Sequence, residues 1–182
     1  LDEILDAIDQ AARLGTIELI VFSGGECFTL GDELVIAVAQ ATQHHIATRC
    51  VSNGYWADSF ESAVERLLPL CRAGLSELNL STGDYHQRYV SSERIINGAR
   101  AALHIGLPVV IMVESREGRD FTARTLLQDE QLAAVLQHPN LTILESPWMP
   151  MEASERTGFT NSGRASASRQ RNRCAITGRS RG

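Results

Sequence analysis

The stretch LIVFSGGECF, residues 19–28, decides the fold. A short apolar run ends at two glycines, and the acidic residue Glu26 follows at once. Such a run is typical of a strand in a parallel sheet that is buried on both faces. Glycines at its end let a ligand approach the backbone and tolerate dihedral angles that other residues avoid. A carboxylate at this point suits an ammonium group better than a phosphate, although a plain strand-to-helix turn with a solvated Glu26 fits as well.

Helical and strand-like segments alternate along the chain on both sides of this stretch. Helical periodicity covers 1–14, 31–46, 59–72, 92–105 and 126–138, and strands are expected at 17–22, 48–52, 75–81, 108–114 and 141–144. This alternation indicates βαβ units and a parallel sheet. A doubly wound sheet and an open barrel both fit, and consecutive crossovers to one side would curl the sheet toward a barrel. The predicted fold class is α/β, a partial (β/α) barrel with parallel strands.

The composition separates a folded body from a different C-terminal segment. Residues 1–147 form the predicted domain, and 148–182 form an irregular tail rich in Arg, Ser and Gly. The net charge is −5, and seven of the 17 cationic residues follow residue 150, so a uniform basic surface for nucleic acid is absent. No apolar run reaches the roughly 18 residues of a membrane span. With no secretory signal and thiols that are expected to stay reduced, we expect a cytoplasmic protein with neither a nucleic-acid nor a membrane partner.

Small and polar residues recur after each expected strand, where parallel α/β folds place their sites. The candidates for ligand binding are Gly24, Gly25, Glu26, Ser52, Asn53, Ser81 and Asp84. Ser81 and Asp84 suit the hydroxyls or the carboxylate of a ligand, but turn and capping chemistry explains them equally well. His86 follows in the same loop and suits either a substrate contact or a plain hydrogen bond.

Three of these stretches together resemble the radical S-adenosylmethionine (SAM) enzymes: SGGECF, VSNGYWA and LNLSTGDYHQRYV, in that order. The resemblance covers residues 1–147 and implies the partial barrel of that family. By this resemblance, the methionine ammonium of SAM is bound by Gly24, Gly25 and Glu26. Its ribose hydroxyls and its carboxylate are bound by Ser52, Asn53, Ser81 and Asp84. The implied parent enzyme would cleave SAM reductively and start radical chemistry on an unknown substrate, a small molecule or a peptide. A flavodoxin or ferredoxin would supply the electron.

The cysteine triplet that holds the [4Fe-4S] cluster of that family, CxxxCxxC, does not occur among the four cysteines of this chain. The resemblance therefore implies a fragment that begins inside a longer protein, with the cluster ligands upstream of Leu1 and no metal ligand in the chain itself. Such a chain would be inactive alone. Two other hypotheses stay open: a non-catalytic binding subunit or degenerate paralogue with the same fold, and an unrelated nucleotide-binding domain. Against the nucleotide-binding domain, the sequence contains neither a G-x-G-x-x-G motif nor a phosphate-loop signature.

Overall fold

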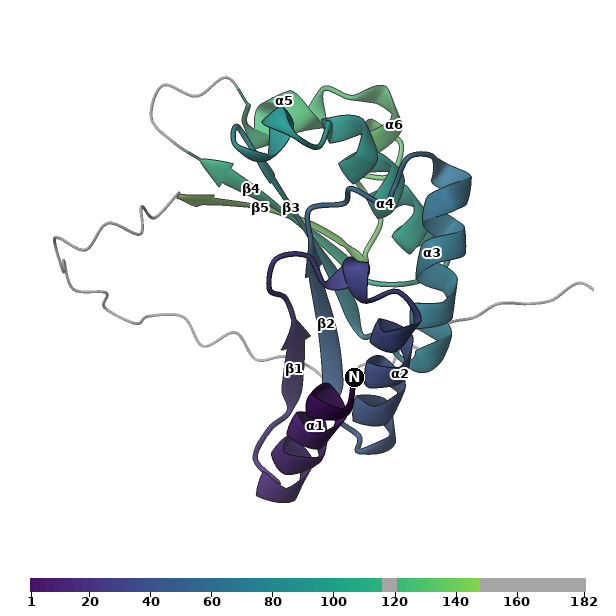
Figure 1. Cartoon of the computed structure of the whole chain (residues 1–182). Helices are drawn as coiled ribbons and strands as arrows, with labels where there is room; N and C mark the ends of the chain where they lie inside the picture. The colour runs from purple at the N-terminus through teal and green to yellow at the C-terminus, as the bar shows by residue number, and fades with distance from the viewer. Residues whose placement is uncertain (116–120, 148–182) are drawn as a thin grey trace, which may run out of the picture.

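The computed structural model describes residues 1–115 and 121–147, and its centre is a sheet of five parallel strands (Figure 1). The strands are β1 (Leu19–Phe22), β2 (Ala47–Ser52), β3 (Glu77–Gly83), β4 (Val109–Ser115) and β5 (Leu141–Pro147). They lie in chain order, β1-β2-β3-β4-β5, and every neighbouring pair is parallel. Their carboxyl ends therefore meet at one edge of the sheet, here called the carboxyl edge.

The helices connect successive strands and pack beside one another. They are α1 (Asp2–Leu14), α2 (Asp32–Gln43), α3 (Phe60–Ala73), α4 (Ser92–His104), α5 (Ala123–Leu127) and α6 (Glu130–Ala133), with short 3₁₀ turns η1 (Cys27–Leu30) and η2 (His86–Arg88). α1 contacts α2, α2 contacts α3, and α3 contacts α4, so the helices cover one face of the sheet. This one-sided arrangement is a partial (β/α) barrel, and the predicted fold class is confirmed.

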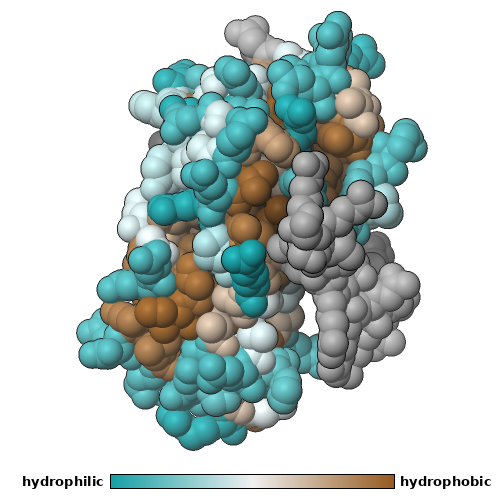
Figure 2. All heavy atoms as spheres, turned by 90° about the vertical axis from the view of Figure 1, so that its right-hand side faces the viewer, coloured by the Kyte–Doolittle hydropathy of each residue, from teal (hydrophilic) through white to brown (hydrophobic). Residues whose placement is uncertain are grey.

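The core lies between the sheet and this helical layer. Alternate strand residues point into it, and Leu78, Leu80 and Ile111 have no exposed surface. Toward the carboxyl edge, Phe28 of η1 stacks on Trp56, with ring centroids 4.4 Å apart. Figure 2 views the molecule from the helical side and shows hydrophilic residues over most of this surface, with apolar areas between them. The helices thus present a polar outer surface over a continuous apolar core.

The remaining strand residues form the opposite face of the sheet, here called the inner face. Asn79 pairs with Val110, and Ser81 pairs with Met112, and these side chains are partly exposed. The expectation that the first strand is buried on both faces is wrong, because Leu19 and Val21 are 41% and 45% exposed. β1 is an edge strand, and the helices cover only one of its faces.

Most predicted helices are present, but the expected helix over 126–138 is wrong. Two short helices, α5 and α6, replace it. Thr122 begins α5 with a capping box to Thr125, and the Asp129 side chain accepts hydrogen bonds from the backbone of Gln131 and Leu132 to begin α6. Aspartate is better suited to a helix cap than to a helix interior, so Asp129 separates two helices. The apolar periodicity of the sequence continues across this separation.

No helix in residues 1–115 and 121–147 is long and apolar enough to cross a membrane. The predicted irregular tail, 148–182, lies outside the described residues.

Candidate ligand-binding site at the carboxyl edge of the sheet

The two glycines after β1 differ in what the fold requires of them. Gly24 has a φ of +97°, a conformation that side chains with a Cβ rarely adopt. Gly25 has no such angle, and a Cβ added there meets nothing within 4 Å. The backbone conformation therefore explains why residue 24 is a glycine, but it does not explain Gly25. At Gly25 the missing side chain leaves open space beside the end of β1.

Glu26 joins the loop after β1 to the loop after β2. Its Oε1 accepts a hydrogen bond from Phe28 N at 3.1 Å, and its Oε2 accepts one from Asn53 N at 2.9 Å. Both carboxylate oxygens thus already bind backbone amides of the chain. The arrangement explains why an acid follows the glycines in this fold, because a carboxylate can hold two loops at once.

The polar residues after β2 mainly hold their own loop in place. Ser52 is buried, and its hydroxyl accepts hydrogen bonds from Gly54 N at 3.1 Å and from Trp56 Nε1 at 2.8 Å. The side-chain oxygen of Asn53 accepts a hydrogen bond from Tyr55 N at 3.0 Å. These bonds shape the turn through local side-chain-to-backbone contacts.

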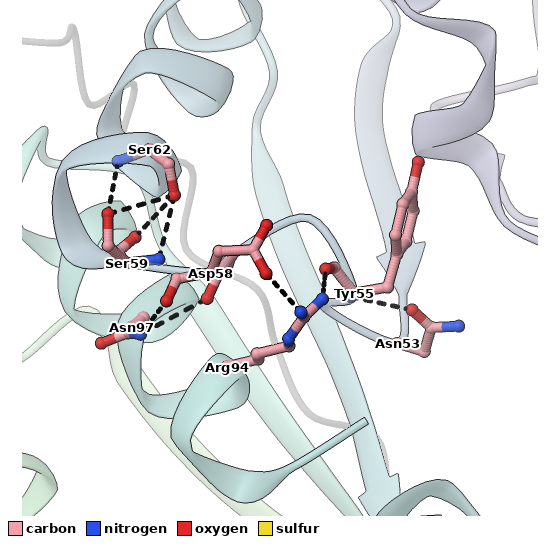
Figure 3. Close-up of polar contacts among 8 residues, drawn as sticks. Asn53, Tyr55, Asp58, Ser59, Ser62, Arg94 and Asn97 are labelled. Carbon is pink, nitrogen blue, oxygen red and sulfur yellow. Dashed lines mark hydrogen bonds and ion pairs between the residues drawn. The ribbon is translucent and has the colours of Figure 1, made fainter. Parts of the chain in front are cut away.

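Residues of α4 clamp the same loop from the other side (Figure 3). Arg94 donates a hydrogen bond to the carbonyl of Tyr55 and forms an ion pair with Asp58. Asn97 Nδ2 donates to the carbonyl of Ala57 at 3.3 Å. Ser59 then begins α3, as its position in the sequence predicts, and Ser62 completes the capping box. The loop after β2 is therefore held by Glu26 of the loop after β1, by its own side chains and by α4.

The ends of β3 and β4 lie unusually close together. Gly83 has a φ of +147°, and a Cβ there would lie 2.8 Å from the carbonyl oxygen and 2.9 Å from the Cβ of Glu114. Only glycine permits this approach without a shift of β4. The following Asp84 accepts a hydrogen bond from Phe121 N at 2.9 Å and so holds the segment that leads to α5.

Beside this contact lies a histidine–carboxylate pair, His86 and Glu114. His86 Nδ1 is 3.5 Å from Glu114 Oε2, and the two side chains are about a quarter exposed. Both atoms are themselves buried, and apart from this ion pair neither has a hydrogen-bond partner among the described residues. A buried polar atom without a partner is uncommon in a native fold and indicates strain, an unseen partner or a functional role.

The seven predicted site residues therefore divide into two groups. Gly24, Glu26, Ser52, Asn53 and Asp84 form or support the loops at the carboxyl edge. Gly25 and Ser81 have no such role in the described residues: Gly25 leaves open space, and Ser81 lies on the inner face in register with Met112. Six of the seven end or follow their strands at this edge, whereas Ser81 lies within β3, two residues before Gly83.

Neither Glu114, the last residue of the expected strand 108–114, nor Asn79 is among the candidates that the sequence predicts. The signal for both was available. Asn79, Ser81 and Gly83 alternate with Leu78, Leu80 and Thr82, so they share the face that the helices leave uncovered. Asn79 and Ser81 are unusual in a strand of a parallel sheet, because such strands are commonly near-continuous apolar runs.

Two buried thiols lie beneath the loop after β1. Cys27 Sγ donates a hydrogen bond to the carbonyl of Val51 at 3.3 Å, and Cys50 has no exposed surface. The hydrogen bond with Cys27, together with burial, raises the pKa of the Cys50 thiol. Cys50 therefore stays protonated and acts as a core residue rather than as a nucleophile or a metal ligand.

Comparisons with known proteins identify no family for the chain. No family model matches it, and no curated protein matches it. Among solved structures, it is similar to one described as dihydrodipicolinate synthase, with 12% sequence identity and a TM-score of 0.44. The alignment covers 79% of this chain and 57% of that chain, so the chain spans little more than half the length of this neighbour.

The resemblance to the radical SAM family is contradicted by these findings. No family model and no curated protein supports the resemblance. Within residues 1–115 and 121–147, no three His, Cys, Asp or Glu side chains gather as metal ligands. Radical SAM and iron–sulfur chemistry are therefore withdrawn as descriptions of this chain, and with the family goes the reason for expecting SAM and a [4Fe-4S] cluster.

Proposed function

We propose that this chain is a ligand-binding domain that takes a small cationic molecule at the carboxyl edge, with the cationic group beside the His86–Glu114 pair. The pair carries the proposal, because a histidine and a carboxylate face each other 3.5 Å apart at the carboxyl edge and each side chain is about a quarter exposed. An ammonium group at this place would donate hydrogen bonds to the partly exposed Glu114 carboxylate. This is the binding-subunit hypothesis, now with a specific site.

The charge of the domain supports a cationic ligand. Residues 1–147 carry ten Arg and twenty Asp or Glu. An excess of negative charge raises the local concentration of cations and disfavours phosphate or carboxylate ligands. A neutral hydroxyl compound would satisfy the same hydrogen bonds but would gain nothing from this field.

The open space at Gly25 supports a ligand that extends along the edge. Neither a left-handed angle nor a neighbouring atom requires glycine there. Glycine is also preferred where a ligand approaches the backbone closely, and this reason remains. A cytoplasmic location belongs to the same proposal, but the cysteines do not argue for it, because Cys27 and Cys50 are free thiols whereas Cys71 is disulfide-bonded.

The proposal is tested with n-butylamine as the probe and n-butanol as its neutral counterpart, on ¹³C-histidine-labelled protein at low salt. We expect butylammonium to shift the ring signals of His86 in a saturable way, while butanol does not. The Glu114→Gln variant should bind butylamine about 10-fold more weakly, because one charge-assisted hydrogen bond is worth about 1.5–3 kcal/mol.

Matched controls are available in the same chain. Glu93→Gln removes an exposed acid from the first turn of α4, so it changes net charge by the same amount without touching the pair. The other four histidines report non-specific effects, and His86→Gln assigns the signal. Absence of binding, or equal weakening by Glu114→Gln and Glu93→Gln, would contradict the proposal.

A further inference from the structure

The loop that carries His86 is held in place from two sides. Gln87 Nε2 donates a hydrogen bond to the Thr82 hydroxyl of β3 at 2.9 Å, and Gln87 Oε1 accepts one from Ser92 N of α4 at 3.0 Å. The backbone carbonyl of His86 accepts a hydrogen bond from Val90 N at 2.8 Å. None of these bonds uses the imidazole ring, so the position of His86 does not depend on the charge of the ring.

The partner of this ring, Glu114, is fixed at the end of β4. It is in register with Gly83, and the close approach of the two strands at this point requires the glycine. His86 Nδ1 then lies 3.5 Å from Glu114 Oε2. Apart from this ion pair, neither atom has a hydrogen-bond partner among the described residues. At these two atoms, therefore, each side chain depends on the other.

The charge of the pair depends on one proton. When the imidazole ring is charged, both of its nitrogens are donors, and the ring compensates the negative charge of Glu114 as an ion pair. When the ring is neutral, it no longer compensates that charge. Histidine is the side chain that ordinarily changes its charge between about pH 5 and pH 8, whereas carboxylates stay ionised in this range. Near neutral pH, the proton on the ring therefore decides whether the pair carries a net negative charge.

The other charged groups on the elements around His86 are engaged elsewhere or exposed. Asp84, which precedes η2, accepts a hydrogen bond at 2.9 Å from the backbone of the segment that leads to α5. Arg88, on η2 itself, lies over a tyrosine ring, 5.1 Å from its centroid. Glu93, in the first turn of α4, is exposed. Among the described residues, Glu114 is thus the acid that pairs with His86.

We infer that the proton on His86 regulates the site: the charged ring pairs with Glu114 and excludes the cationic ligand, and loss of the proton admits it. This inference rests on the proposed function, because it concerns the same carboxylate. The imidazolium and the ligand are both cations, so they compete for one negative charge and repel each other. A charged ring should therefore weaken binding about as much as Glu114→Gln does, or about 10-fold. By thermodynamic linkage, bound ligand weakens the binding of the proton by the same factor.

The experiment measures the dissociation constant of n-butylamine by calorimetry between about pH 5.5 and pH 8, at low and constant salt. The probe stays cationic throughout, since an alkylammonium group loses its proton only near about pH 10. We expect the native chain to bind about 10-fold more weakly at the acidic end. His86→Gln is the matched variant, and its affinity should not change with pH. It retains the other four histidines, so a general effect of their charge would still appear in it.

A second measurement uses the native chain alone and decides the question if His86→Gln does not fold. In ¹³C-histidine-labelled protein, saturating butylamine should lower the midpoint of the His86 ring titration by about one pH unit. An unchanged midpoint would overturn the inference.

The outcomes separate the inference from the function on which it rests. If butylamine binds the native chain equally well at both ends of the pH range, the inference is overturned and the site remains. The same holds if His86→Gln loses affinity at acidic pH as the native chain does. If butylamine binds the native chain at no pH, the proposed function fails and the inference fails with it. Circular dichroism at each pH shows that a lost affinity is not a lost fold.

Discussion

Glu26 and Asn53 are joined by a hydrogen bond of 2.9 Å from the backbone amide of Asn53 to Glu26 Oε2. The bond connects the loop after β1 to the loop after β2, and the second carboxylate oxygen binds Phe28 N in its own loop. Glu26 thus sets the distance between two neighbouring loops at the edge where the site lies. Its first role is to hold this edge together.

The substitution Glu26→Ala should lower the free energy of unfolding by about 1–3 kcal/mol, because two part-buried backbone amides lose their acceptor. Urea denaturation followed by circular dichroism measures the change. Glu65→Ala, at an exposed position of α3, serves as the control and should stay within about 0.5 kcal/mol of the native chain. Equal stability of the Glu26→Ala variant would show that the carboxylate does not hold these loops.

The neighbouring glycines should respond differently to the same substitution. Gly24→Ala should destabilise the chain by about 1 kcal/mol or more, since alanine is strained at a φ of +97°. Gly25→Ala should leave stability within about 0.5 kcal/mol, because its Cβ meets nothing within 4 Å. Thermal unfolding of the two variants tests this difference, and equal losses would contradict it.

Gly83→Ala should be more damaging than either. Its Cβ would lie 2.8 Å from the carbonyl oxygen of Glu114, which is backbone and cannot move aside cheaply. We expect a loss of about 1–3 kcal/mol and a displaced Glu114. Amide exchange across the β3–β4 pairs measures the local effect. Native protection at the end of β4 in this variant would mean that the close approach is unimportant.

Asp9 provides a pH-dependent contribution to stability. Its side chain accepts a hydrogen bond from Gln40 Nε2 and contacts His44 Nε2, each at 2.7 Å, and so connects α1 to α2. These contacts lower the pKa of Asp9 below its usual 3.8. A lowered pKa in the folded state means that the stabilisation is present above about pH 4 and is lost as the pH falls through the folded value.

Asp9→Asn should therefore be less stable than the native chain at pH 7, with a difference that shrinks as the pH falls from 5 toward 3. Urea titrations at a series of pH values measure this difference. Asp2→Asn is the control, since Asp2 is exposed in the first turn of the same helix. A difference that is independent of pH would contradict the assignment.

The sequence predicts the fold well because its helix caps and turn glycines lie where the helices of the structure begin and end. Gly15 and Gly74 end α1 and α3 in the left-handed conformation, and the capping position of Ser59 is correct. It fails where the tertiary context decides. β1 has the composition of a strand buried on both faces, yet only one of its faces is covered. The apolar pattern of 126–138 crosses a break that Asp129 introduces.

The site could be predicted only in part. Strand ends in a parallel sheet lie at one edge, so the positions of Gly25, Ser81 and Asp84 follow from the order of elements. The partners of these residues do not follow, since the bonds of Glu26 to Asn53 and of Asp84 to Phe121 join residues far apart in the sequence. The radical SAM resemblance failed because short stretches such as SGGECF also arise from loop chemistry alone.

The most direct test of the account is the affinity of the native chain and of the Glu114→Gln variant for n-butylamine, read from the ring signals of His86. The account predicts saturable shifts in the native chain and a dissociation constant about 10-fold higher in the variant, with Glu93→Gln unchanged. An affinity that is the same for the native chain and Glu114→Gln, or no shift at His86 at all, would contradict a cationic ligand at the carboxyl edge.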